Sequence, residues 1–412
     1  MDDELTTSPR PTTDPSSAPS WASTWLPPVG VFVLVRILVT IASPHWVRPW
    51  TTSATPWTRI DAFNYLDIAS YGRRISVCPE KLIHFFHGHI TCGTAAWLPG
   101  YPYVLRVVHE VTHLSVAASG VLVSSVFVLS ALELLWVGLL RQEPRARGLL
   151  LLTLFAVFPG AVYNFAIFPN SMALFGVVGT IVALRSERFV LATVSMVVAA
   201  AAYPSVIYAF PAFLCALIVV DPTCRTKLAV AKRTCLGLLA LSPYAALWIH
   251  DQVVFHRWNL FSQIQSDAGV TVFPPKNPVS IVWHLVVKRD TLTQVLQGPT
   301  ASWWIAAQFA VATGLCATAA VLLWRNRRAG LNFATEVYPV LIGLSVYTGV
   351  FLSGTTGGVY RGIVIAAPAV VIFRRTTTRV LIIALVVTAV VTIGISTLYF
   401  DRTTLYNALL HG

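Results

Sequence analysis

Eleven apolar runs, separated by short polar or basic segments, take up most of the chain from residue 28 onward. A helix needs about 20 apolar residues to cross the hydrocarbon core of a membrane. Several runs are shorter, so we expect some helices to be broken or to cross only part of the bilayer. The sequence therefore predicts an all-α polytopic membrane protein. The expected spans are residues 28–42, 113–140, 149–168, 170–184, 189–203, 205–220, 234–250, 301–324, 334–353, 360–373 and 380–399.

The charges agree with this class. Only 11% of the residues are charged, against about 25% in a typical soluble domain. The formal net charge of +12 does not indicate nucleic-acid binding, because the basic residues stand in short clusters between apolar runs. That arrangement is typical of the positive-inside rule for membrane proteins.

If the eleven spans are right, the basic clusters all fall on one side, which the rule assigns to the cytoplasm of a multi-pass cell-membrane protein. We then expect residues 1–27, rich in Ser, Thr and Pro, to be a disordered cytoplasmic tail. Residues 28–412 would form the transmembrane domain, with 43–112 and 251–300 as large loops on the outer face. Most of the polar chemistry would lie in those loops.

Residues 57–72 predict a short amphipathic helix within the 43–112 loop. Asp61, Tyr65 and Gly72 recur at helical spacing along one stripe, and Asp67 lies on another side. We expect this helix in the membrane interface, with its aromatic residues at headgroup level. Those aromatic residues are Trp57, Phe63, Tyr65 and Tyr71.

The same loop contains two cysteines and three histidines. Cys78 and Cys92 lack a partner CxxC pair, so a zinc site is not indicated. If the loop faces an oxidising compartment, a disulfide between them and two free thiols both stay open. His84, His87 and His89 lack a fourth ligand, so no metal site is predicted, and metal dependence is left undecided.

Three segments, in this order, resemble the PIG-V-like family of mannosyltransferases (GPI mannosyltransferase II-type). The segment Asp61-Ala-Phe-Asn-Tyr65-Leu-Asp67-Ile-Ala-Ser-Tyr71-Gly72 is similar to the aspartate motif in the first outer loop of that family. Trp97-Leu-Pro-Gly-Tyr101-Pro102 resembles the element that follows it, and Phe158-Pro159 through Asn170-Ser171 resembles the next outer turn. Arg361 precedes an Ala-Ala-Pro run, as an arginine tends to do in the family.

The chain departs from the family pattern at three places. Ile60 stands where a Trp precedes the aspartate, Asn170 stands where the family has Glu, and Tyr203-Pro204 replaces a frequent Arg-Pro pair. These departures indicate a distant member of the family, and the Ala, Val and Arg usage fits a GC-rich bacterium.

The resemblance implies a GT-C-like bundle that uses a polyprenyl-phosphate sugar, with mannose as the family's sugar. The acceptor would be a lipid-linked or cell-envelope glycan, and the site would face the outside among membrane lipids. Asp61 is the expected base, because inversion requires a group that removes the acceptor's hydroxyl proton opposite the leaving phosphate. No cofactor is implied.

Arginine suits planar, bidentate binding of phosphate oxygens. Arg361 is the favoured ligand of the donor phosphate, with Arg59 and Arg73 as further candidates. For Arg59 and Arg73, contact with lipid headgroups or a role in topology is the simpler explanation. The candidates for the acceptor side or for support of the site are Tyr65, Asp67, Trp97, Tyr101 and Asn170.

Two other functions stay open. A glycolipid or lipid transporter would explain the bundle, but we see no internal repeat, and Arg36 and Glu133 are nearly the only charges within the spans. A non-catalytic partner subunit of a glycosyltransferase would explain the departures from the family pattern.

Overall fold

The computed structural model describes residues 21–41, 43, 54–59, 61–78, 91–221, 223–267, 299–353 and 361–401. Within these ranges the predicted all-α class is confirmed, and the β-structure is a single two-stranded ladder. Strand β1 (Ile75–Ser76) pairs antiparallel with β2 (Cys92–Gly93). The histidines at positions 84, 87 and 89, Ile60, and most of the second large loop lie outside the described residues.

The α-helices mostly follow the predicted apolar runs, apart from three that lie within the segments predicted as large loops. They are α1 (Trp21–Thr40), α2 (Ala62–Tyr71), α4 (Gly100–Thr112), α5 (Val116–Leu135), α6 (Arg145–Ala156), α7 (Val162–Phe165), α8 (Asn170–Arg185), α9 (Phe189–Ala202), α10 (Phe210–Val219), α11 (Lys227–Leu238), α12 (Ser242–Phe255), α13 (Leu260–Asp267), α16 (Pro299–Asn326), α17 (Tyr338–Leu352) and α19 (Thr378–Asp401). Tighter or wider helical turns join or extend them: η2 (Thr55–Trp57), η3 (Thr94–Ala96), η4 (Trp136–Leu140), η5 (Pro204–Ala209), η6 (Leu239–Leu241), η7 (Phe333–Val337) and η8 (Ile363–Arg375).

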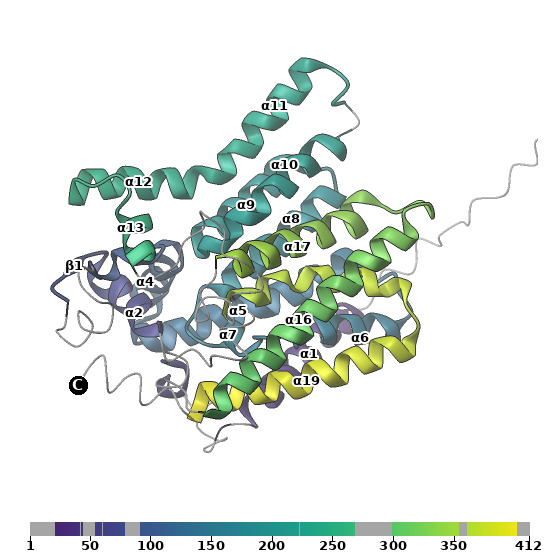
Figure 1. The fold of residues 1–412 in the computed structure, drawn as a ribbon, viewed down its shortest axis with the longest axis horizontal. Helices are drawn as coiled ribbons and strands as arrows, with labels where there is room; N and C mark the ends of the chain where they lie inside the picture. The colour runs from purple at the N-terminus through teal and green to yellow at the C-terminus, as the bar shows by residue number, and fades with distance from the viewer. Residues whose placement is uncertain are drawn as a thin grey trace, which may run out of the picture.

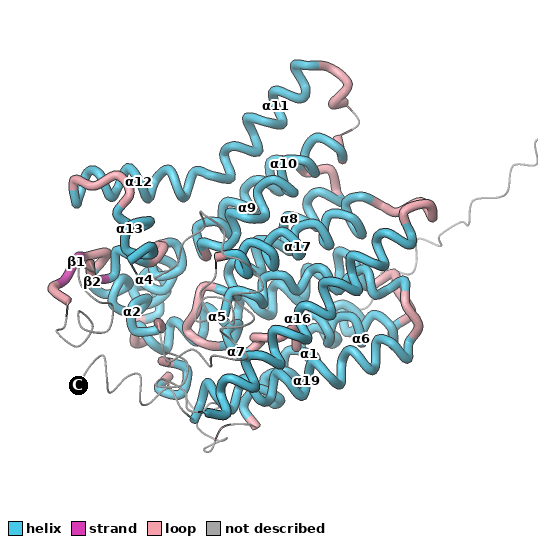
Figure 2. The backbone as a smooth tube through the Cα atoms, viewed as in Figure 1, coloured by secondary structure: helices cyan, strands magenta, loops and turns pink. Residues whose placement is uncertain are grey.

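Most of the long helices run beside one another along the long axis of the molecule (Figure 1). Helices α11 and α12 form a bent arm along one edge, and α2, α4 and α13 gather at one end with the short ladder. Figure 2 places most of the connecting loops at the two ends of the bundle. The apolar runs therefore form the helical bundle, and α2, which carries the motif of the first loop, lies at one end of it.

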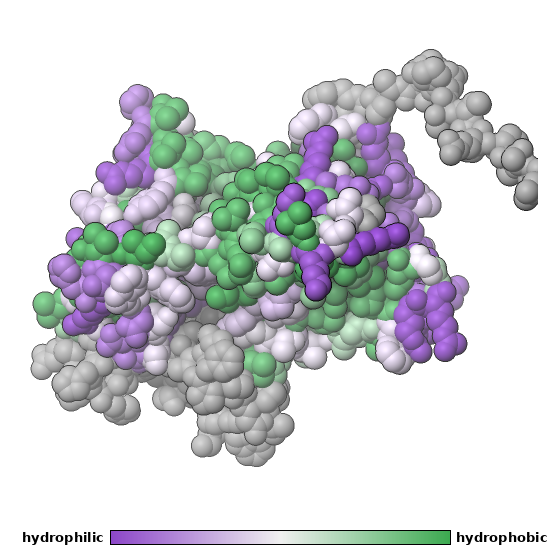
Figure 3. All heavy atoms as spheres, turned by 90° about the horizontal axis from the view of Figure 1, so that it is seen from above, coloured by the Kyte–Doolittle hydropathy of each residue, from purple (hydrophilic) through white to green (hydrophobic). Residues whose placement is uncertain are grey.

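Several helices are apolar enough for a membrane. By length and composition, four of those described can cross one, and the number of spans in the whole chain stays a prediction. On the face seen in Figure 3, hydrophilic residues gather toward the two ends and hydrophobic residues lie between them, as a membrane protein requires. The four are Val116–Leu140, Trp303–Asn326, Phe333–Leu352 and Thr378–Phe400, and shorter apolar helices are Thr24–Thr40, Asn170–Arg185, Phe189–Ala202 and Pro204–Val219.

The expected span 149–168 is broken. Helix α6 ends at Ala156, because Pro159 and Gly160, whose φ is 95°, interrupt the helical backbone before the short α7. The interrupting segment is buried, and distant side chains satisfy its carbonyls. The Thr392 hydroxyl donates to the Val157 carbonyl at 2.7 Å, and the Ser124 hydroxyl donates to that of Ala166 at 2.8 Å. Irregular backbone is tolerated at membrane depth only when it is buried in protein in this way.

The run expected at 360–373 is not an α-helix but a 3-10 helix, η8, with Pro368 inside it. Every residue from Ile363 to Phe373 is buried, and η8 contacts α6, α16 and α17. Gly343 of α17 permits this close approach, since a Cβ there would meet the Ala366 carbonyl at 2.8 Å. A 3-10 helix rises about 2 Å per residue, so these 13 residues cover roughly 26 Å, close to the thickness of the hydrocarbon core.

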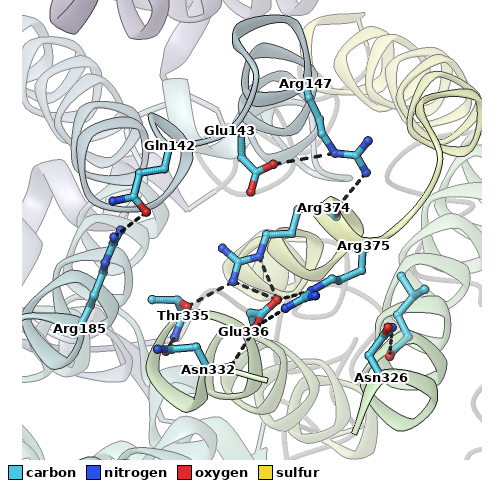
Figure 4. Close-up of polar contacts among 11 residues, drawn as sticks. Gln142, Glu143, Arg147, Arg185, Asn326, Asn332, Thr335, Glu336, Arg374 and Arg375 are labelled. Carbon is cyan, nitrogen blue, oxygen red and sulfur yellow. Dashed lines mark hydrogen bonds and ion pairs between the residues drawn. The ribbon is translucent and has the colours of Figure 1, made fainter. Parts of the chain in front are cut away.

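A group of charged and polar residues, called here the Glu336 cluster, holds the last turn of η8 in place through hydrogen bonds. It consists of Glu336, Arg374, Arg375 and Asn332. The Glu336 carboxylate, whose side chain is 2% exposed, accepts hydrogen bonds from Arg374 Nε at 3.1 Å and from Arg375 Nε at 2.6 Å. The Asn332 backbone N–H donates to the same carboxylate at 2.9 Å. Figure 4 shows both arginines pointing at Glu336.

The predicted basic clusters meet around this group. Arg147 of α6 donates to the Arg374 carbonyl at 2.8 Å, and Arg185 of α8 donates to the Gln142 side chain at 3.0 Å. Residues from α6, α8, η7 and η8 thus share one close-up view (Figure 4). The side of the membrane that these arginines face stays a prediction.

We expect Glu336→Gln to destabilise the bundle, because it leaves Arg374 largely buried without a negative partner. Breaking a buried ion pair from one side costs about 3 kcal/mol or more. The midpoint of thermal unfolding in detergent should fall by several degrees. Glu110→Gln is the matched control, since Glu110 pairs with Arg106 on an exposed face of α4, where a pair contributes ~1 kcal/mol or less. Equal midpoints for the two variants would contradict the structural role of Glu336.

Candidate functional site

Asp61 and Arg361 form an ion pair at one end of the bundle. A Nη1 hydrogen of Arg361 is donated to Oδ2 of Asp61 across a separation of 300 residues. The side chain of Arg361 is 16% exposed and that of Asp61 is 14% exposed, so the pair is largely shielded from water but still accessible. The structure thus brings together the expected base and the expected phosphate ligand, which come from opposite ends of the sequence.

Local structure explains the position of Asp61. Helix α2 begins at Ala62, and Asp61 is the residue that precedes it, with its carboxylate making no capping hydrogen bond to the helix. Gly72 ends the helix with a φ of 80°, a backbone conformation that glycine adopts without strain. The predicted helix is confirmed over residues 62–71, and Asp61 stands directly before its first turn rather than within it.

Asn170 holds Arg361 from the other side. It is fully buried at the start of α8, and its side-chain amide donates to the Arg361 carbonyl at 2.7 Å. Its Oδ1 is also buried and has no hydrogen-bond partner within the described part of the chain. Asn170 therefore fixes the backbone of Arg361 and leaves one buried acceptor beside it.

Buried aromatic rings form the wall behind the pair. The ring of Tyr65 meets Tyr101 and Phe168 edge to face, at centroid distances of 5.9 and 5.7 Å. The Tyr101 hydroxyl lies 2.8 Å from Ser124 Oγ. Burial raises the pKa of Tyr65 and of Tyr101 well above the usual phenol value, so both stay neutral at any physiological pH.

The expectation that the aromatic residues of this stretch lie at headgroup level is wrong for two of them. Trp57 is fully buried and Tyr65 is nearly so, because they pack into the core. Trp57 meets the ring of Phe400 and carries the guanidinium of Arg36 at 4.8 Å from its ring centre. Tyr71, by contrast, is exposed. The buried rings of Trp57 and Tyr65 therefore support the first loop from inside the protein.

Tyr203 is a site neighbour that the sequence analysis missed. It follows α9, and a Cβ placed on Gly362 would come within 3.3 Å of its hydroxyl oxygen, so the phenol lies against the residue after Arg361. The available signal was a Tyr-Pro pair directly after an apolar run, which was noted only as a departure from the family.

The remaining arginine candidates lie in two different settings. Arg59, two residues before Asp61, has a buried Nε without a hydrogen-bond partner among the described residues. Arg73 is already engaged, because its guanidinium is fully buried and donates to Asp251 at 2.6 Å and to the Ala95 carbonyl at 2.6 Å. Asp251 also accepts from the Phe261 N–H at 3.2 Å. Arg73 therefore ties the first loop to α12 and α13.

Two of the supporting candidates lie away from the pair. Asp67 accepts two hydrogen bonds from Arg74, at 2.6 and 3.1 Å, in a surface ion pair. Trp97 is half-buried between the main core and a small cluster that contains Leu260. The sequence analysis had preferred Asp61 to Asp67 as the base, and the contacts of Asp67 are those of a surface residue that stabilises its helix.

Cys78 and Cys92 form a disulfide, with their Cα atoms 5.1 Å apart. The short ladder places them, since Ser76 pairs with Cys92 and Ile75 pairs with Gly93. Gly93 has a φ of 116°, and any side chain there would clash with the backbone of β1. No group of three or more potential metal ligands occurs among the residues that the structure describes.

Comparison with known proteins gives a loose structural likeness. No family model matches the chain, and no curated protein matches it in sequence. The oligosaccharyltransferase AglB of Archaeoglobus fulgidus, solved in complex with an inhibitory peptide and a dolichol-phosphate, is similar with 12% identity and a TM-score of 0.47, over 92% of this chain and 56% of that one. The apo form of the Archaeoglobus fulgidus oligosaccharyltransferase is similar with 12% identity and a TM-score of 0.44, over 95% and 56% of the two chains.

The complex of the Archaeoglobus fulgidus oligosaccharyltransferase with zinc and sulfate is similar with 11% identity and a TM-score of 0.43, over 89% of this chain and 53% of that one. The chain therefore spans about half the length of the solved structures that it matches. The likeness concerns the arrangement of helices, and it says nothing about the residues of the site.

The disulfide gives a test of the compartment in which the first loop folds. We expect Cys78 and Cys92 to resist alkylation in membranes isolated under non-reducing conditions and to react after reduction. A disulfide persists only in an oxidising compartment. Mass spectrometry of the peptides after alkylation in denaturing detergent checks this, with the free Cys215 and Cys235 as internal controls that react without reduction. Labelling of Cys78 before reduction would contradict an outward-facing loop.

Proposed function

We propose that the chain is an inverting, GT-C-type glycosyltransferase. It would move a sugar from a polyprenyl-phosphate donor to a lipid-linked or cell-envelope glycan on the outer face of the membrane. The observation that supports this most is the ion pair of Asp61 and Arg361. Base and phosphate ligand were assigned to these two residues on separate grounds, and the residues are in contact.

The chemistry needs both groups. The acceptor's hydroxyl oxygen attacks the anomeric carbon while the bond from that carbon to the donor's phosphate oxygen breaks. Asp61 accepts the proton of the hydroxyl, and the polyprenyl phosphate leaves with its negative charge beside Arg361. Because the leaving phosphate is already a stable anion, no acid is required for it.

The surroundings suit this task. Exclusion of most water from the pair strengthens the interaction of Arg361 with a phosphate. The neutral rings of Tyr65 and Tyr101 form an apolar wall that does not compete for the proton. Mannose, the sugar of the family that the sequence resembles, is the donor sugar to test before others.

Asp61→Asn should abolish transfer without unfolding the protein. Loss of a general base typically costs 10² to 10⁴ in rate, so we expect a fall of about that size. In cells that lack the chain, mass analysis of membrane glycolipids should find a species short of one sugar. Wild type and Glu110→Gln should restore the full species, and Asp61→Asn should not. Full restoration by Asp61→Asn would rule out Asp61 as the base.

Arg361→Lys should weaken use of the donor while keeping the charge. A lysine is a point charge and lacks the planar fork that binds two phosphate oxygens. We expect kcat/KM for a polyprenyl-phosphate sugar to fall by about 10 to 100-fold, the size of one lost charge-assisted hydrogen bond of 1.5–3 kcal/mol. Steady-state kinetics in membranes at varied donor concentration measures this. An unchanged value would place the phosphate elsewhere, with Arg59 as the next candidate.

A further inference from the structure

Arg361 would have two anionic partners if the proposed function is right. In the structure its guanidinium forms an ion pair with the Asp61 carboxylate. In the reaction the same guanidinium must receive the donor phosphate. A carboxylate and a phosphate that share one arginine repel each other by about 4 kcal/mol at 4 Å in a partly buried site. The two anions therefore compete for Arg361.

The carboxylate is also a poor base while it is paired. A cation in contact favours the charged form of a carboxylate and reduces its tendency to take up a proton. Asp61 can therefore act as the base only when it has left Arg361. The paired arrangement is a resting state of the site.

The contacts indicate which partner moves. Arg361 is fixed through its backbone, because its carbonyl accepts the Asn170 hydrogen bond at 2.7 Å. Asp61 is less restrained: its side chain makes no capping hydrogen bond to α2, so it can change rotamer without disturbing that helix. The movement that frees the guanidinium is a rotation of the Asp61 side chain.

We propose that the donor phosphate displaces Asp61 from Arg361, so that the base is released by the arrival of the donor. This inference rests on the proposed function and adds to it an order of events. The donor binds first and exchanges one ion pair for another. The displaced carboxylate then stands beside the bound donor, unpaired and able to receive the proton of the acceptor hydroxyl.

The exchange makes a prediction opposite to that for an ordinary binding residue. Removing the Asp61 charge should tighten binding of a phosphate, since the competing anion is gone. We expect Asp61→Asn to bind a short-chain prenyl phosphate without sugar roughly tenfold more tightly than wild type does, while transfer is lost. Calorimetric titration of the purified protein in detergent measures this affinity.

Two variants frame the measurement. Glu110→Gln removes a carboxylate from an arginine pair far from the site and should bind the prenyl phosphate as wild type does. Arg361→Gln should lose the saturable binding, both alone and combined with Asp61→Asn. Equal or weaker binding by Asp61→Asn would overturn the exchange, while binding that depends on Arg361 would leave the proposed function standing. Binding that is absent in wild type, or independent of Arg361, would overturn the proposed function itself.

A structure of the wild-type protein with the prenyl phosphate tests the exchange without any substitution. We expect a phosphate oxygen at hydrogen-bond distance from Arg361 and the Asp61 carboxylate turned away from it. An Asp61–Arg361 pair that persists beside a bound phosphate would overturn the exchange, even if Asp61→Asn proved too unstable to purify.

Discussion

Arginines whose side chains are only 16% exposed lie at both ends of η8, and each is neutralised by a carboxylate from a distant segment. Arg361 precedes the helix and meets Asp61, whereas Arg374 ends it and meets Glu336. Between them every side chain is buried in apolar surroundings. Unpaired charges at such positions would be costly, so the first loop and the start of η7 and α17 must dock where they do. The pair of Asp61 and Arg361 thus joins the first loop to the start of η8.

The apolar periodicity was sufficient to predict most of the helices, because hydrophobic length alone separates membrane spans from their connections. It failed where backbone chemistry decides. Pro159 and Gly160 break the expected span at 149–168, and η8 is a 3-10 helix. Neither result follows from hydropathy, since both depend on which buried neighbours can satisfy the backbone groups that an α-helix would have paired.

The site was predictable in part. The positions of Asp61 and Arg361 as base and phosphate ligand came from motif and charge, but their contact did not, because a pair 300 residues apart leaves no local pattern. Trp57 was expected at headgroup level and Arg73 as an outward candidate for binding phosphate, but both are buried. A charged or aromatic side chain in a loop gives the same sequence pattern whether it faces water or a partner such as Asp251. Tyr203 was missed because its packing against Gly362 is visible only in three dimensions.

The stretched coil of η8 also sets a distance. Its 13 residues would be about 6 Å shorter as an α-helix, which rises about 1.5 Å per residue instead of 2 Å. Glu336 lies in η7, directly before α17, which packs along η8, whereas Asp61 lies in the first loop. The longer coil sets Arg361 and Arg374 farther apart than an α-helix would, so that one buried segment is paired with carboxylates from two separate parts of the chain.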